Sequence, residues 1–461
     1  MLRGLCEEIS HLEHTHAFGF VTAIVGSLVE VSGLQRVVSV GSVCRLKNRS
    51  GETFPCEVVG FKGDQTLVMG YDSIEGLGPG CKVTYEGHHN VIYPHDTWLG
   101  RTLDGFGKPL DDLGRVPSGP KAYDLNASPP AAHKRRLIEK RIDLGVRAMN
   151  TFTTCCSGQR MGIFAGSGVG KSILLSMLAR FSKADVIVIG LIGERGREVR
   201  EFIDKHLGAE GMARSVVVVA TSDEPALMRR RAAYTTLSTA EYFRDQGKEV
   251  LCLMDSVTRF AMALREIGLS IGEPPTTKGY TPNVFVELPR LLERAGPGSD
   301  QIQENYQGNI TGLFTVLVEG GDDNEPVSDT TRGILDGHIM LDRKIAERGR
   351  FPAINILRSV SRTMPDCNND EESAVIQQAR DYLSTYDDME ELIRLGAYRR
   401  GSNPNVDKAI QYYDKLDPFL AQSKEHQITF EEGFEDLSTI LGMTGNGEAE
   451  MSDENYQATG S

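Results

Sequence analysis

The residues best suited to chemistry lie in FAGSGVGKSILL, a segment that begins at Phe164 and ends at Leu175. Its glycines let backbone N–H groups converge on phosphate oxygens near the positive end of a following helix. The lysine that follows can reach the β- and γ-phosphates of a nucleotide, and the serine hydroxyl can bind Mg²⁺. The segment therefore predicts a nucleotide phosphate site made of Ala165, Gly166, Ser167, Gly168, Val169, Gly170, Lys171 and Ser172.

The segment departs at one position from the consensus G-x-x-x-x-G-K-[ST], because Ala165 stands where the pattern has glycine. Alanine gives up only the left-handed backbone conformation, so the loop survives if its first residue needs no positive φ. The preceding run MGIFA predicts a strand, and the following SILLSMLARF predicts a helix. This strand–loop–helix context disfavours the alternative, a glycine-rich turn that matches by chance.

Two acidic residues follow apolar strands later in the chain. EVLCLMDS ends in Asp255, which is a candidate Mg²⁺ ligand, although an aspartate at a strand end also commonly caps a helix. LIGERGREV contains Glu194, a candidate for orienting the attacking water at the carboxyl edge of the sheet. Spacing alone favours the alternative for Glu194, a surface salt bridge with the arginines that follow it, Arg195, Arg197 and Arg200.

The elements that must position these residues change in character along the chain. Residues 18–90 contain short β-branched runs broken by glycine, which predict a small β-barrel or sandwich. A turn-rich connection over 98–114 and an extended linker over 118–136 follow. From residue 158, buried strands alternate with helical stretches, which predicts a mainly parallel sheet with helices on both faces. Beyond residue 369 the pattern is helical, and the polar end predicts disorder.

Composition narrows the class of protein. The net charge of -14 and the pI of about 5.3 argue against a protein that tracks along nucleic acid. The eight cysteines form no C-x-x-C pair and show no metal-ligand spacing, which indicates reduced thiols. The start of the chain has no secretory h-region, and the longest apolar runs of the whole sequence are too short to span a bilayer. These features predict a cytoplasmic protein.

The first residues carry an apolar stripe, with Leu2, Leu5, Ile9 and Leu12 on one helical face. The stripe suits a partner-binding helix, a frayed end or a helix docked on its own barrel, and Gly4 weakens any helix there. The sequence leaves these alternatives open.

Several long motifs resemble the catalytic subunits of the rotary ATP synthase superfamily: GIFAGSGVGKS, GERGREV, EVLCLMDSVTRFAMALRE, LLERAG and PAINILRSVSR. Within it, LGRTLDGFGKPLDD, LIRLGAYRRGS and SVSRTMPD are similar to the type III protein-export ATPases, which comprise the flagellum-specific export ATPase and its injectisome relatives. The likeness covers roughly residues 18–440.

The resemblance implies an α/β fold in three parts: an N-terminal small β-barrel, a central RecA-like parallel-sheet ATPase domain and a C-terminal helical domain. On this basis the chain divides into a partner-binding segment, a barrel, an ATPase domain that includes a linker over 96–150, a helical domain and a disordered tail. The corresponding ranges are 1–17, 18–95, 96–369, 370–445 and 446–461.

The resemblance also implies roles for individual residues. The loop 165–172 matches, and alanine at its start is tolerated in this branch. Glu194 matches the carboxylate that positions water, with Arg195 as its neighbour, and Asp255 matches the Mg²⁺-side aspartate. Arg259 matches an arginine near the phosphates. Aromatic residues on the two sides of adenine match Phe351 and Phe419, for which simple core packing is the alternative.

Arg362 in SVSRT matches an arginine finger, which stabilises the charge on a transferring phosphoryl group and can act on a neighbouring subunit. The same chain carries Lys171, Glu194 and Asp255, so it holds both halves of the machinery. A chain with both halves can build a ring from copies of itself. The resemblance therefore implies a homohexamer with sites at the subunit interfaces.

The function implied is hydrolysis of ATP with Mg²⁺, coupled to release of flagellar export substrates from chaperones and their delivery to the export gate. Injectisome secretion is the alternative, and no single residue decides between the two. A Rho-like RNA translocase is disfavoured by the acidic balance, the single Trp98 and the lack of an aromatic and basic stripe in the barrel. A rotary ATP synthase catalytic subunit is disfavoured by Arg362 in this chain.

The partners implied are further copies of the chain, a regulator that binds the N-terminal segment, a coiled-coil stalk protein, export substrates with their chaperones, and a membrane export gate. No nucleic acid is expected. The implied location is the cytoplasm, with peripheral association at the inner-membrane export apparatus.

Overall fold

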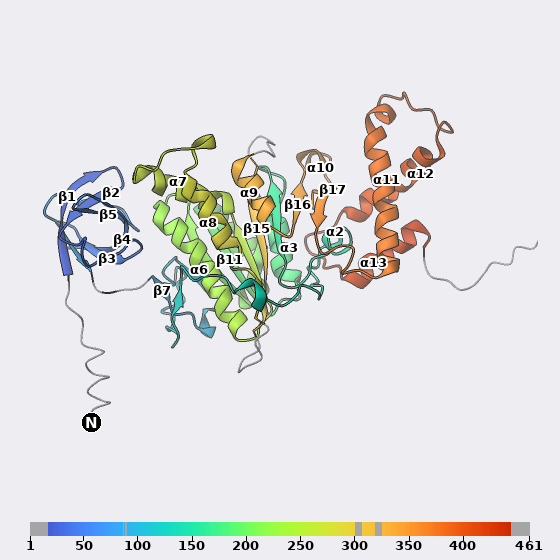
Figure 1. Ribbon diagram of the computed structural model, residues 1–461. Helices are drawn as coiled ribbons and strands as arrows, with labels where there is room; N and C mark the ends of the chain where they lie inside the picture. Colours follow the sequence, from blue (N-terminus) through green and yellow to red (C-terminus); the bar gives the residue numbers. More distant parts are fainter. Residues whose placement is uncertain (1–16, 86, 88–89, 300–306, 319–324, 444–461) are drawn as a thin grey trace, which may run out of the picture.

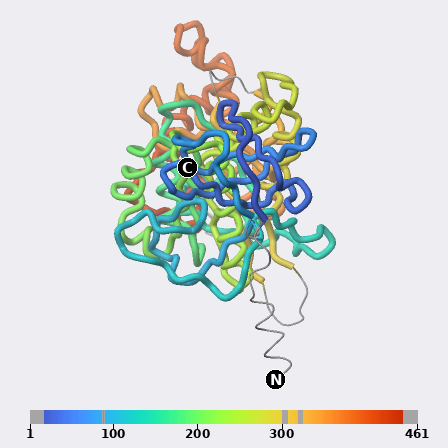
Figure 2. Tube along the Cα trace, turned by 90° about the vertical axis from the view of Figure 1, so that its left-hand side faces the viewer, coloured from blue at the N-terminus to red at the C-terminus, as the bar shows by residue number. Residues whose placement is uncertain are grey.

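The computed structural model describes residues 17–443 except 86, 88–89, 300–306 and 319–324. Three parts lie in a row, with a barrel at one end, a sheet flanked by helices in the middle and a group of helices at the other end (Figure 1). Viewed along this row, the barrel lies in front of the central part (Figure 2). The apolar stripe over residues 2–12 and the tail 446–461 lie outside the described residues.

The N-terminal part is a closed barrel with the strand order β1-β2-β5-β4-β3-β6. Alternate residues of its strands point inward, and valines from five strands meet in its core, among them Val21, Val29, Val58, Val68 and Val83. The barrel confirms the prediction for this region. Its strands are β1 Ala17–Val25, β2 Leu28–Ser32, β3 Val43–Lys47, β4 Thr53–Lys62, β5 Gln65–Gly70 and β6 Lys82–Tyr85.

The outer surface of the barrel carries a local aromatic contact. Phe18 and Phe20 lie on the outer face of β1 with their rings edge to face, 5.7 Å apart, and the Lys82 ammonium lies 4.3 Å from the Phe18 ring centroid. The barrel thus carries one small aromatic and basic cluster, which is not a stripe along its surface. Its cause is that alternate residues of a strand face outward, so the sequence FGF exposes both rings.

The central sheet has the order β17-β16-β10-β15-β13-β11-β12-β8, and β14 pairs with β15 outside this path. Pairing is parallel except where β16 meets β17 and where β14 meets β15. This confirms the predicted mainly parallel sheet. The strands are β8 Thr102–Leu103, β10 Arg160–Ala165, β11 Val186–Glu194, β12 Ser215–Thr221, β13 Val250–Asp255, β14 Gly296–Pro297, β15 Asn309–Leu317, β16 Gly337–Leu341 and β17 Ile354–Ser361.

Helices cover both faces of this sheet because its strands are apolar on both sides. Along β11, Ile187 and Ile189 pack toward α3, whereas Val186 and Val188 pack with α6 and α7. Figure 1 shows α6, α7 and α8 layered on one side. The helices of this part are α2 Arg147–Phe152, α3 Lys171–Phe181, α4 Gly196–Glu201, η3 Phe202–Leu207, α5 Gly208–Ala213, α6 Ala226–Asp245, α7 Val257–Ser270, η4 Thr277–Gly279, α8 Pro282–Leu292, α9 Pro326–Ile334 and α10 Arg343–Glu347.

The segment between barrel and sheet is more structured than a linker. It contains η1 Asp96–Trp98 and η2 Ala132–Lys134. β8 joins the edge of the central sheet beside β12, and β9 Tyr123–Asp124 pairs with β7 Val91–Ile92. Each of these strands is only two residues long, which is too short to show an alternating pattern. The turn-rich sequence around them therefore predicts a connection and not strands.

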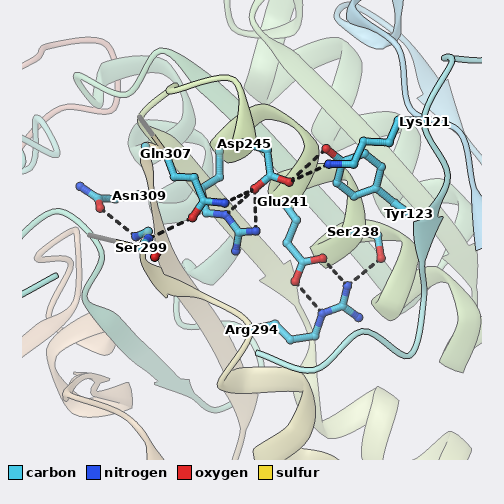
Figure 3. Close-up of polar contacts among 12 residues, drawn as sticks. Lys121, Tyr123, Ser238, Glu241, Asp245, Arg294, Ser299, Gln307 and Asn309 are labelled. Carbon is cyan, nitrogen blue, oxygen red and sulfur yellow. Dashed lines mark hydrogen bonds and ion pairs between the residues drawn. The ribbon is translucent and has the colours of Figure 1, made fainter. Parts of the chain in front are cut away.

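Polar contacts hold this segment to the central part (Figure 3). The Tyr123 hydroxyl donates to Asp245 at the end of α6 over 3.1 Å, and the Lys121 ammonium lies 3.5 Å from the same carboxylate. Nearby, the fully buried Arg294 guanidinium donates to both carboxylate oxygens of Glu241 over 2.8 and 2.6 Å. Arg294 also donates to the Leu125 carbonyl, so this buried ion pair fixes the path of the segment.

The C-terminal part is helical, as predicted. α11 Asp370–Arg394 begins at a capping box formed by Asn369 and Glu372, and α12 Pro404–Leu420 packs along it. Two stacked tyrosine pairs join these helices, Tyr382 with Tyr412 and Tyr386 with Tyr413. α13 Phe430–Leu441 packs on α2. Among the residues described, no helix is both long and apolar enough to cross a bilayer.

Candidate nucleotide site

The phosphate loop lies between β10 and α3. Ala165 is the last residue of β10, where it pairs with β15 and β16 and its methyl group lies in the core. Positive φ occurs further on, at Gly168 and Gly170, with values of +77° and +87°. Alanine is therefore accommodated at the first position because the chain there is an ordinary strand.

The space in front of α3 fits a phosphate group. α3 has eleven residues, and Gly170 at its N-cap provides no side-chain hydrogen bond to the first turn. A Cβ atom added to Gly168 would meet nothing within 4 Å, and one added to Gly166 would meet only the Val318 carbonyl, at 3.9 Å. The loop glycines therefore border open space at the N-terminus of α3, and a helix N-terminus favours an anion. Ser172, one residue into α3, is exposed at the same place.

Lys171 contacts both of the predicted acidic residues, Glu194 and Asp255. Its ammonium forms an ion pair with Asp255 and lies 3.5 Å from Glu194 Oε1. Burial works against the charged form, but the two carboxylates outweigh it and raise the pKa of Lys171. The structure therefore brings together Lys171, Glu194 and Asp255 from α3, β11 and β13 at one edge of the sheet.

Asp255 is buried at the carboxyl end of β13 and has a second partner. The Thr315 hydroxyl, on the neighbouring strand β15, donates to Asp255 Oδ1 over 2.7 Å. Thr315 is fully buried. It is a residue of the site that sequence reasoning missed, and its only signal is a hydroxyl within the apolar run GLFTVLVE.

Glu194 ends β11 with only 14% of its side chain exposed. Burial, and then the nearby Asp255 carboxylate, raise its pKa to about 7 against the opposing effect of Lys171. The exposed Arg195 pairs with Glu198 at 2.8 Å instead. Of the two readings of Glu194, the geometry shows a buried carboxylate beside Lys171 and gives no ion pair with Arg195.

Arg259 lies on the first turn of α7, against the end of β11. A Cβ atom added to Gly193 would lie 2.8 Å from Arg259 Cβ, so a glycine allows this close approach. Arg259 Nε is buried and has no hydrogen-bond partner among the described residues. This buried nitrogen without a partner lies on a residue that packs against Gly193, the residue before Glu194 in the sequence, and it fits an anionic ligand.

The two predicted adenine contacts differ. Phe351 is 41% exposed, and its ring lies 3.2 Å from where a Cβ atom on Gly170 would be, so it stands beside the loop. Phe419 is only 4% exposed; its ring packs edge to face on Phe152, and the Arg147 guanidinium lies 4.9 Å from its centroid. The observed contacts of Phe419 are core packing, and its role at adenine stays a prediction.

Arg362 lies at the end of the strands opposite to the phosphate loop, and we call these two ends the edges of the sheet. β17 runs antiparallel to β16, pairing Ile354 with Leu341 near the loop and Ser361 with Gly337 far from it. Arg362 follows Ser361 directly and is exposed. At about 3.3 Å per residue, a strand of this length separates the two edges by roughly 20 Å. Arg362 therefore does not join Lys171 within one chain.

Comparison with known proteins agrees with this geometry. Residues 145–361 match the ATP synthase alpha/beta family, nucleotide-binding domain, and residues 21–87 match the beta-barrel domain of that family. The flagellum-specific ATP synthase of Caulobacter vibrioides is 54% identical over 440 residues, 95% of this chain and 99% of that protein. The chain belongs to the ATP synthase alpha/beta family. Within it, residues 368–439 match the T3SS EscN ATPase C-terminal domain.

Other members of the ATP synthase alpha/beta family are similar over nearly the whole chain. The type 3 secretion system ATPase of Xanthomonas euvesicatoria is 44% identical over 434 residues, 94% of this chain and 96% of that protein. The assembled ATPase EscN of enteropathogenic E. coli superposes with a TM-score of 0.85 at 40% identity, covering 92% of this chain and all of EscN. EscN in complex with its central stalk EscO gives a TM-score of 0.82, with the same identity and coverage.

Proposed function

We propose that the protein is an ATPase that drives type III export of flagellar proteins, releasing substrates from chaperones and delivering them to the export gate. The observation that carries this proposal is the cluster of Lys171, Glu194 and Asp255 beside a phosphate loop, in a chain 54% identical to a flagellum-specific ATP synthase. The cluster supports hydrolysis of a nucleotide, and the similarity over the full length supports flagellar protein export as the process that the hydrolysis drives.

Each residue of the cluster has a chemical task in this proposal. Gly166–Ser172 N–H groups and the Lys171 ammonium bind the phosphates, and Glu194 as a carboxylate accepts a proton from the attacking water. Ser172 and Asp255 would hold Mg²⁺, which neutralises phosphate charge when bound. Lys171 exchanges its carboxylate partners for phosphate oxygens. Arg259 contributes a second cation beside Glu194.

Arg362 completes the site from outside. It is exposed at the edge of the sheet opposite to its own loop, so it is available to a neighbouring copy. An arginine finger that acts in this way stabilises the transferring phosphoryl group. We therefore include a homohexameric ring in the proposal, with one site at each subunit interface. The assembled state named for EscN supports self-association of this chain.

The remaining partners are also part of the proposal. A coiled-coil stalk protein in the ring is supported by the complex of EscN with its central stalk EscO. A regulator at residues 1–17, export substrates with their chaperones, and peripheral attachment to the inner-membrane gate from the cytoplasm rest on the resemblance of the chain to export ATPases.

Injectisome secretion is the second candidate, favoured by the Xanthomonas euvesicatoria relative and by EscN. The other two alternatives lose their support. The match of residues 368–439 to a type III secretion ATPase domain counts against both an RNA translocase and a rotary ATP synthase subunit.

Deletion of the gene tests the flagellar reading. We expect cells without filaments that do not swim, restored by the wild-type gene and not by Lys171→Ala, since turnover is required. A deletion strain that swims normally contradicts the flagellar reading; loss of secretion of another set of proteins in that strain would indicate injectisome use.

A further inference from the structure

The turn that carries Phe351 is held by the C-terminal helices. Arg350, just before it, is 9% exposed, and its Nε lies 3.1 Å from Asp417 Oδ1 on α12. A second guanidinium nitrogen, Nη2, donates to the Ile354 carbonyl over 3.0 Å. One side chain thus ties the start of β17 to α12.

The backbone of Phe351 itself is held from the same side. Its carbonyl accepts from the N–H of Gln422, just after α12, over 2.9 Å. The Gln422 side chain in turn accepts from the Arg147 N–H over 2.7 Å and donates to the Gly145 carbonyl over 2.8 Å. The exposed Phe351 ring, beside Gly170, therefore stands on a turn whose position depends on α12 and the segment after it.

A stacking ring contributes more to binding when its position is fixed beforehand, because ordering an exposed side chain on binding costs free energy. We propose that Arg350 and Asp417 are positioning residues that hold Phe351 against the nucleotide base, so that the C-terminal helical region sets the affinity for the base. This inference rests on the proposed base contact of Phe351. It deepens the proposed site, since it makes a domain distant from the phosphates responsible for recognising the base.

A neighbouring ion pair separates positioning from simple docking of the two parts. Arg348, two residues before Arg350, pairs with Glu390 on α11 and so bridges the same two regions. Its arginine is more exposed than Arg350, 52% against 9%, whereas Glu390 and Asp417 are similarly exposed, at 33% and 39%. If the ion pairs only dock the helices, loss of either pair has the same kind of effect on turnover.

The test compares Asp417→Ala with its matched control Glu390→Ala in steady-state ATP hydrolysis. We expect Asp417→Ala to raise KM for ATP by about fivefold to tenfold with kcat changed less than about twofold, since about 1 kcal/mol is a factor of five. We also expect a smaller preference for ATP over GTP. Inhibition by inorganic tripolyphosphate, which has no base, stays unchanged, and Glu390→Ala behaves like the wild type.

Equal changes in KM for the two variants, or a weaker hold on tripolyphosphate in Asp417→Ala, overturn the positioning role. Asp417→Asn, which keeps the shape of the side chain, gives the same comparison if Asp417→Ala unfolds. Phe351→Ala tests the base contact separately from the positioning of the ring. If it leaves KM and base preference unchanged, the base contact itself is wrong; if it changes them and both Asp417 variants do not, only the positioning is wrong.

Discussion

The two ends of the strands of the central sheet carry two groups of residues to which the proposed function assigns different halves of one reaction. At the edge where β10, β11 and β13 end, Lys171 contacts both Glu194 and Asp255, and the three side chains are only 6–14% exposed. At the other edge, Arg362 is exposed at the end of β17. The first group is assembled by folding of a single chain. In the proposed function, Arg362 acts only on a neighbouring copy, so folding and assembly would each complete a different part of the site.

The largest effect is expected at the end of the sheet with Lys171, Glu194 and Asp255, which we call the assembled edge because folding of a single chain brings these residues together. Lys171→Ala removes the cation that binds the phosphates, so turnover should fall by about 10³-fold or more. Measurement of phosphate release and of nucleotide binding checks this, with Lys205→Ala, an exposed lysine on η3, as the control. Turnover of Lys171→Ala near the wild-type rate contradicts the phosphate site.

The other edge is tested by Arg362→Ala, for which a loss of about 10³-fold in kcat is expected while nucleotide binding stays nearly intact. Arg358→Ala, on the same outward face of β17, shows whether the loss belongs to one arginine or to the charge of the whole face. Mixing Arg362→Ala with Glu194→Gln subunits should restore part of the activity. Absence of any restoration counts against action between subunits.

The raised pKa of Glu194, about 7, predicts a pH dependence that belongs to the assembled edge alone. The carboxylate is the form that accepts a proton, so kcat/KM should rise about tenfold per pH unit below 7 and level off above it. The same pKa lies above its unfolded value, so the protonated form stabilises the fold at low pH and this stability is lost as pH rises through 7. Relative to wild type, Glu194→Gln should therefore gain stability as pH rises from about 4.5 to about 7, by at most about 3 kcal/mol, with no further gain above pH 7. Thermal unfolding at pH 5 and pH 8 measures it, and an equal gain at both values argues against the shift.

The smallest effect is expected at Thr315, which orients Asp255. Thr315→Val should lower kcat/KM by about threefold to tenfold and raise the Mg²⁺ concentration that gives half-maximal turnover, as expected for one lost hydrogen bond to a charged group. Thr315→Ser should restore both. Thr311→Val, at an equally buried threonine of β15 that bonds Gly158 far from the site, is the matched control. If both valine variants shift the Mg²⁺ dependence alike, Thr315 does not orient Asp255.

The sequence predicts the assembled edge well because the ends of parallel strands meet at one edge. Lys171, Asp255 and Glu194 each follow or end an apolar run, so their neighbourhood follows from the order of the elements. Thr315 and the Arg350–Asp417 contact could not be predicted, since they depend on which side chains meet across strands and helices far apart in the sequence. Two-residue β8 is too short to have a pattern, and the burial of Phe419 is a matter of three-dimensional packing that an aromatic residue type does not reveal.

The antiparallel direction of β17 also determines how many complete sites a given number of copies can form under the proposed mechanism. Each chain offers one loop and one Arg362 at opposite edges, so an open row of n copies joins only n − 1 pairs. The copy at one end keeps an idle loop, and the copy at the other end keeps an idle arginine. Closure of the row adds the last pair without adding a chain. The specific activity per chain should therefore increase with the number of copies in the row and increase once more when the ring closes. A measurement of the catalytic rate then shows whether the ring is closed.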